Sequence, residues 1–287
     1  MIGRINFKNH QIHYNSLSDF NETKVNETEV KVKDSIGKMN VKSTYEITFS
    51  PYDVCVLPQN KILCADCDGK LLALYDKHFK LVKVIRKINR KAIQPTSIAI
   101  NSEDQIYVSD VACHQIMLLD LDFNLISSVG SRGNNTDEFC TPFSISYKYN
   151  YLYVCDTFNK RIQIYSESLK YIESINLPIM PFSIQISNTS ICINCKYFYD
   201  INTLALIKEH SDCYFHKVSE IGSRFYAYNF NLSRIYCYDE KGNLNWDMQL
   251  QHTSENDFLP NGKFFILDEY FIFTSYTKKK FYKIRLV

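Results

Sequence analysis

The sequence predicts an all-β domain of repeated four-stranded units, arranged as a six-bladed β-propeller of antiparallel blades closed by an N-terminal strand. The first observation is a repeat: proline-led apolar segments begin at Pro51, Pro95, Pro142 and Pro181, about 40–50 residues apart. The second is composition, because the 45% of hydrophobic residues are rich in the β-branched and aromatic types that favour strands. The third is spacing, since short polar turns separate the apolar runs, as in consecutive hairpins.

The first three units each show four strand-like runs. In the first unit the runs cover residues 51–56, 61–66, 70–76 and 81–85. In the second they cover residues 95–100, 105–110, 114–120 and 125–130. In the third they cover residues 142–147, 151–156, 160–165 and 171–175. Four short strands per unit are what one propeller blade requires.

The repeat of strand-like runs is less clear in the second half of the chain. A fourth unit begins at residue 181 and continues through 191–194 and 204–207. A fifth covers about 214–250, with runs at 224–229 and 234–239, and a sixth covers about 258–287, with runs at 270–275 and 281–286. The sixth unit has room for three strands, so a fourth strand has to come from elsewhere.

The alternating segment 44–49 is the candidate for that strand. Its pairing with the sixth unit would close the ring and remove two exposed strand edges. The expected organisation is therefore a linker or extra edge segment over residues 1–40 and the propeller over residues 41–287.

Composition limits the functional classes. The net charge of +2 argues against strong non-specific nucleic-acid binding, although it allows a basic patch on one face. No run of about 18 apolar residues is present, so no membrane contact is expected. The N-terminus lacks the apolar stretch of a signal peptide, and the ten cysteines are scattered, several within strand-like runs. These features predict a cytoplasmic protein with reduced cysteines.

One segment resembles a known repeat family. Across residues 151–165 a strand ends in Asp156, Asn159 follows three residues later, and Arg161-Ile162-Gln163 opens the next strand. This pattern resembles the NHL repeat, and residues 130–142 resemble the glycine-rich entry to an NHL blade. The resemblance covers residues 41–175 well, whereas the later units lack the Asp…Asn-x-Arg set.

The resemblance implies a propeller like the C-terminal domain of tripartite-motif ubiquitin ligases, which binds RNA or protein. Cys and His residues with RING or B-box spacing are absent, so ligase activity is not expected of this chain. The residues themselves indicate a structural role for the signature. Asp156 and Asn159 are suited to hydrogen-bond a tight turn, and Arg161 is suited to pair with Asp156 across it.

Motifs that carry chemistry are missing. The sequence contains no HExxH, no G-x-S-x-G, no P-loop and no dinucleotide-binding motif. His114, His210 and His252 fall in expected loops, where they are either solvated or would have to converge to form a three-His metal site. The main expectation is thus a non-catalytic chain without cofactor or small-molecule substrate. The alternative is a metal-dependent propeller enzyme of the amidating-lyase or lactonase type.

Strand alternation sorts the loops onto two faces. Loops between the second and third strands of a blade share one face, here the first face, with the loops that join blades; the other loops form the opposite face. The opposite face collects acidic residues: Asp76, Glu103, Asp104, Asp120, Asp122, Glu167, Asp239 and Glu240. The first face collects the candidate binding residues: Arg86, Lys87, Arg90, Lys91, Arg132, Phe158, Lys160, Lys196, Tyr197, Tyr276, Lys278 and Lys279, with Phe198 beside them.

Cations and aromatic rings together suit single-stranded RNA, because cations bind phosphates and rings stack on bases. The expected partner is therefore single-stranded RNA or a protein. The alternative is that the lysine-rich loops are solvated and serve solubility.

Overall fold

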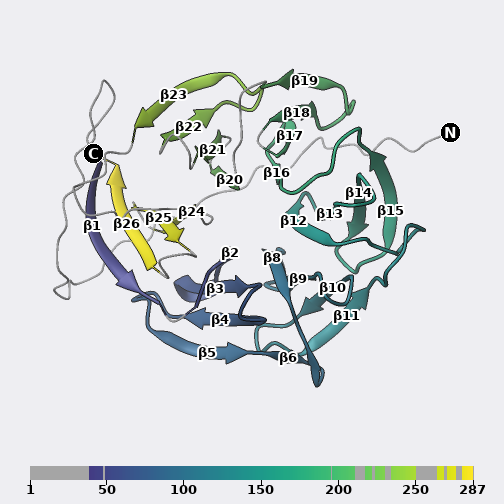
Figure 1. The fold of residues 1–287 in the computed structure, drawn as a ribbon, viewed down its shortest axis with the longest axis horizontal. Coiled ribbons are helices and arrows are strands. Elements are labelled where there is room, and N and C mark those ends of the chain that lie inside the picture. The colour runs from purple at the N-terminus through teal and green to yellow at the C-terminus, as the bar shows by residue number, and fades with distance from the viewer. Residues whose placement is uncertain are drawn as a thin grey trace.

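The computed structural model describes residues 39–47, 49–194, 196–210, 217–221, 224–229, 234–249, 264–267, 270–275 and 280–286. Within these ranges the strands form six four-stranded antiparallel sheets and one two-stranded ribbon. The sheets surround a common axis, with one strand of each sheet near the axis and one at the rim (Figure 1). The chain is therefore a β-propeller.

Five sheets are blades of four consecutive strands. Blade 1 contains β2 (Asp53–Leu57), β3 (Lys61–Asp66), β4 (Leu71–Tyr75) and β5 (Leu81–Ile85), with a 3₁₀ turn, η1 (Pro58–Asn60), after β2. Blade 2 contains β8 (Pro95–Ile100), β9 (Ile106–Asp110), β10 (Gln115–Leu119) and β11 (Leu125–Val129). Blade 3 contains β12 (Pro142–Lys148), β13 (Tyr151–Asp156), β14 (Arg161–Ser166) and β15 (Tyr171–Asn176).

The other two consecutive blades lie in the second half of the chain. Blade 4 contains β16 (Ile184–Ile186), β17 (Ser190–Ile193), β18 (Tyr197–Asp200) and β19 (Leu206–Glu209). Blade 5 contains β20 (Lys217–Ile221), β21 (Arg224–Asn229), β22 (Arg234–Tyr238) and β23 (Leu244–Gln249). The run at 197–200 was not expected as a strand, and it supplies the third strand of blade 4.

The expected count of six blades was wrong, because only five of the described sheets are blades of consecutive strands. Five blades come from consecutive strands, whereas the remaining sheet is composite: β1 (Met39–Glu46) pairs with β26 (Lys280–Leu286), followed by β25 (Tyr270–Ser275) and β24 (Phe264–Leu267). The predicted pairing of an N-terminal strand with this sheet is confirmed, but the strand lies earlier than the expected residues 44–49, because its pairing ends with Glu46 opposite Lys280. Ile47 is buried in a cluster with Phe265 and Phe281, so the chain turns into the core at that point.

Apolar clusters between neighbouring sheets hold the propeller together. The inner strands contact one another in the order β2, β8, β12, β16, β20, β24 and back to β2. The cluster between blades 1 and 2 contains Leu63 and Leu72 of one blade and Ile98 and Val108 of the next. Since each cluster needs both sheets, a single blade cannot bury its own apolar surface. Among the described residues, no helix has the length and apolar character needed to cross a membrane.

Candidate functional site

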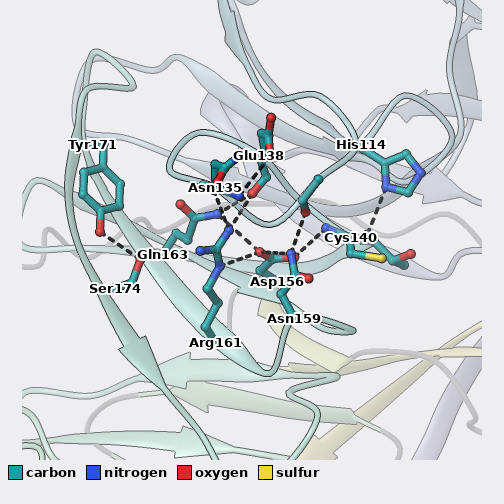
Figure 2. Close-up of polar contacts among 12 residues, drawn as sticks. His114, Asn135, Glu138, Cys140, Asp156, Asn159, Arg161, Gln163, Tyr171 and Ser174 are labelled. Carbon is teal, nitrogen blue, oxygen red and sulfur yellow. Dashed lines mark hydrogen bonds and ion pairs between the residues drawn. The ribbon is translucent and has the colours of Figure 1, made fainter.

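The residues of the blade 3 signature form one buried hydrogen-bond network (Figure 2). The Asp156 Oδ1 atom accepts a hydrogen bond from the backbone N–H of Cys140 at 2.7 Å. Its Oδ2 atom accepts from Asn159 Nδ2 and from Arg161 Nε, both at 2.8 Å. The predicted turn contacts and the predicted Asp156–Arg161 ion pair are therefore confirmed.

The same network fixes the loop that enters blade 3. One terminal nitrogen of Arg161 donates to the carbonyl oxygens of Asn135 and Glu138, at 2.7 and 2.9 Å. Gln163 Nε2 donates to the Glu138 carbonyl at 2.7 Å, and Asn159 donates to the Gly133 carbonyl at 2.8 Å. These polar groups are directed at the protein itself, so the signature stabilises the blade and is not a ligand site.

Four of the predicted cations lie on or beside one hairpin of the first face. This basic hairpin consists of β6 (Lys87–Ile88) and β7 (Lys91–Ala92), inserted between blades 1 and 2, and it had been expected to be a loop. Ile88 is buried in the cluster between those blades, whereas Lys87, Arg90 and Lys91 are exposed. Arg86 precedes the hairpin, and its guanidinium donates to the Gly69 carbonyl at 2.9 Å.

The remaining candidates are separate from the hairpin. Arg132 and Lys160 are exposed in blade 3 loops, as is Phe158, with 54% of its surface accessible. Lys196 pairs with Glu209 at 3.2 Å and lies over the Tyr197 ring, 5.0 Å from its centroid.

The last candidate residues lie in the second half of the chain. Phe198 is fully buried within β18, which corrects its expected place beside the first-face cations, because strand alternation turns its ring into the core. Tyr276, Lys278 and Lys279 lie outside the described residues.

Three rings that were not predicted meet at the first-face ends of the inner strands. Tyr52, Phe143 and Phe182 each follow the leading proline of their unit, in blades 1, 3 and 4. The Tyr52 and Phe143 ring centroids are 5.6 Å apart, and those of Phe143 and Phe182 are 5.8 Å apart, both edge to face. Blade 2 separates blades 1 and 3 around the ring, so this aromatic cluster brings non-neighbouring blades together at the axis. Phe182 remains 47% exposed.

The two described candidate histidines do not converge. His114 Nδ1 accepts a hydrogen bond from the backbone N–H of Thr141 at 3.1 Å, so the ring carries its proton on Nε2. His210 Nε2 lies 2.8 Å from the Gly242 carbonyl of the next blade, and burial lowers the pKa of this imidazole. His252 lies outside the described residues, and within the described ranges no group of three His, Cys, Asp or Glu side chains is placed to hold a metal ion.

Four of the described cysteines lack the features of a catalytic nucleophile. Cys64, Cys155 and Cys192 are buried with free thiols, as expected for small apolar packing residues. Cys113 is exposed, but desolvation and the neighbouring Asp110 carboxylate raise the pKa of its thiol. A raised pKa disfavours the reactive thiolate.

Comparison with known proteins finds similarity in structure alone. No family model, the NHL repeat included, and no curated protein sequence matches the chain. A catalytically inactive histidine-to-alanine variant of virginiamycin B lyase from Staphylococcus aureus, with quinupristin, is similar at a TM-score of 0.66 and 11% identity, covering 87% of this chain and 100% of the lyase. A putative 6-phosphogluconolactonase from Bacteroides uniformis reaches 0.55 and 13%, covering 70% and 71%. The WD40 propeller domain of Doa1 reaches 0.59 and 10%, covering 86% and 96%.

These similarities correct the expectation of a non-catalytic chain. That expectation took the propeller as a binding scaffold, whereas the structures of this shape include a lyase and a lactonase-type protein as well as a WD40 domain. At identities of this size the comparisons establish the fold, and the fold is one that enzymes and binding domains both use. The chain is thus a β-propeller of four-stranded blades with an aromatic cluster at its axis.

Proposed function

We propose that this chain is a propeller enzyme of the lyase or lactonase type, whose small-molecule substrate binds on the aromatic cluster of the first face. The observation that carries the proposal is the half-exposed Phe182 ring, held edge to face against Phe143 at the end of the propeller axis. Small-molecule sites are mostly apolar, with few polar groups that orient the ligand. A fixed ring with one exposed side provides such an apolar surface.

His114 is connected to this surface through Thr141, and its imidazole is the candidate polar group for catalysis. Its Nδ1 is bound by Thr141, two residues before Phe143, which orients the imidazole and leaves the Nε2 proton for a ligand. Positioned imidazoles act as general acids or bases in many enzymes. The similar virginiamycin B lyase is catalytically inactive when one histidine is replaced by alanine, so one enzyme of this fold depends on a histidine.

Turnover of two small molecules tests this proposal. Purified chain is incubated with quinupristin or 6-phosphogluconolactone, the ligands suggested by the similar structures. Ring opening is followed by chromatography with tandem mass spectrometry, because opening by elimination leaves the mass unchanged whereas lactone hydrolysis adds one water. We expect conversion of one of them, with the rate reduced about 100-fold in His114→Asn, because general catalysis contributes about 10²–10⁴-fold. Asparagine tolerates the positive φ of 52° at this position.

Binding is expected to depend on the ring. Phe182→Ala should raise KM, while Phe158→Ala, which removes an exposed ring of the same face outside the cluster, serves as the matched control. Intact chain that converts neither compound, or a Phe182→Ala variant that behaves like Phe158→Ala, would contradict the proposal.

A second candidate function is binding of single-stranded RNA, and the basic hairpin favours it. The hairpin exposes Lys87, Arg90 and Lys91 within five residues, so several phosphates of a strand can be contacted from one projection. The exposed Phe158 ring provides a surface on which a base can stack.

A salt titration checks this candidate. Fluorescein-labelled single-stranded RNA should bind with an affinity that falls steeply with salt, and the slope should decrease by about one per phosphate contact that is lost. Arg90→Glu, Lys91→Glu and Arg132→Glu together are expected to abolish binding. Lys80→Glu with Lys170→Glu, on exposed turns of the opposite face, is the control. An equal loss of RNA affinity in the first-face variant and in the control variant would contradict a first-face RNA site.

A further inference from the structure

The outer strand of each consecutive blade contains one extra residue opposite the third strand. In blade 2, for example, Leu118 pairs with Ser127 and Leu119 with Leu125, so Ile126 is left over as a β-bulge. The equivalent extra residues in blades 1, 3 and 4 are Val82, Ile172 and Ile207, and all four aliphatic side chains are exposed. Bulges at sheet edges redirect a side chain and discourage edge-to-edge pairing.

Beside blade 2 the bulge residue lines an open pocket of about 490 Å³. The pocket lies between the outer strands of blade 2 and the opposite-face loops of blade 3. Leu118 and Ile126 form its apolar wall, whereas Glu103 and Glu167 provide two carboxylates. An apolar wall beside carboxylates suits a ligand with an aliphatic stem and a cationic end.

Glu167 is fixed on one side and open on the other. Its Oε1 atom accepts hydrogen bonds from Tyr147 Oη and, at 3.2 Å, from Ser102 Oγ. Burial, and secondly the hydrogen bond to Glu167, raise the pKa of Tyr147 to about 12, so the phenol remains a donor at neutral pH. Within the described part of the chain, Glu167 Oε2 accepts no hydrogen bond.

In blade 5, the equivalent carboxylate uses both of its oxygens to bind the neighbouring blade. Glu240 occupies the same position as Glu167, because each directly follows the residue whose N–H bonds across the turn between the third and fourth strands, Asp239 and Ser166. Its Oε1 accepts from the Asn188 backbone N–H at 2.8 Å, and its Oε2 accepts from Thr189 Oγ1 at 3.0 Å. Both oxygens of Glu240 therefore hold the neighbouring blade, whereas Glu167 keeps one oxygen for another donor.

We propose that this pocket binds a lysine or arginine side chain of a basic peptide segment. The cationic group donates to Glu167 Oε2 and lies near Glu103, while the aliphatic stem packs on Ile126. Charge-assisted hydrogen bonds of this kind are roughly twice as strong as neutral ones. The site is on the opposite face from the aromatic cluster and does not depend on the proposed enzymatic function.

Fluorescence anisotropy with a labelled octapeptide of alternating lysine and valine tests the proposal. We expect binding that weakens about tenfold or more in Glu167→Gln, the range for loss of a hydrogen bond to a charged group. Asp122→Asn is the matched control, because it removes one carboxylate from the exposed opposite face of blade 2 outside the pocket. Ile126→Ser should also weaken binding, and the corresponding glutamate–valine peptide should not bind.

Two results would contradict the proposal that this pocket binds a basic peptide. Intact chain that does not bind the lysine–valine peptide excludes it, and equal losses in Glu167→Gln and Asp122→Asn assign the binding to general attraction by the acidic face. Phe182→Ala is expected to bind the peptide normally, so failure of the enzymatic proposal leaves this result unaffected.

Discussion

Replacing Arg161 with leucine is expected to destabilise the folded chain by about 3–5 kcal/mol, the cost of breaking a buried ion pair from one side. The Asp156 side chain is fully buried, and the Arg161 side chain is only 13% exposed. Without the guanidinium, the Asp156 carboxylate keeps only neutral donors, namely the Cys140 N–H and the amides of Asn159 and Gln163. The loss also removes two hydrogen bonds to the loop before blade 3.

Urea unfolding measures the overall effect, and hydrogen exchange of residues 131–139 measures the local one. Arg132→Leu is the control, because it removes an exposed cation from the same loop and should change stability by about 0.5 kcal/mol at most. Arg161→Lys should restore only part of the stability, since an ammonium lacks the planar guanidinium that reaches Asp156 and two carbonyls together. An Arg161→Leu midpoint equal to that of Arg132→Leu would show that the network does not stabilise the blade.

The first three blades could be predicted because their information is local. Alternating apolar residues, a leading proline and an Asp that closes the second strand recur in each unit. The turn bonds of Asp156 and its pair with Arg161 follow from residue types, whereas the bonds to the loop carbonyls required the structure. Blade 4 has a shorter turn between its second and third strands, and its sequence places the Tyr197 and Phe198 rings among the first-face cations. Strand alternation instead buries Phe198 and leaves Tyr197 partly exposed.

The basic hairpin and the aromatic cluster required the structure for a different reason. Each strand of the hairpin has two residues, too few to show a period, and only the buried Ile88 and Ile93 mark its attachment. The contact between Tyr52 and Phe143 joins blades that are far apart in sequence. In the sequence, each of these aromatic residues directly follows the leading proline of its unit. This pattern indicates a cluster only when the closed propeller is known, because closure brings the ends of the inner strands together.

Side chains near the axis link the inner strands of four blades in series. The Asp53 Oδ2 atom accepts hydrogen bonds from Ser97 Oγ at 2.7 Å and from the Ile98 backbone N–H at 2.9 Å, both in blade 2. Ser97 Oγ in turn accepts from the Ile145 N–H of blade 3 at 3.1 Å. At the same position in blade 3, a serine accepts from the Ile184 N–H of blade 4 at 3.4 Å.

Asp53→Ala is therefore expected to destabilise the propeller by about 2–6 kcal/mol, because the two buried donors of blade 2 lose their acceptor at about 1–3 kcal/mol each. Asp53→Ser is the informative comparison. Blades 2 and 3 bridge to the next blade with a serine hydroxyl at this position, so the variant should retain the bond to the Ile98 N–H and lose about half as much stability. Chemical denaturation of both variants separates the two cases. If serine proves as costly as alanine, the carboxylate acts through its charge and not as one of a series of equivalent acceptors.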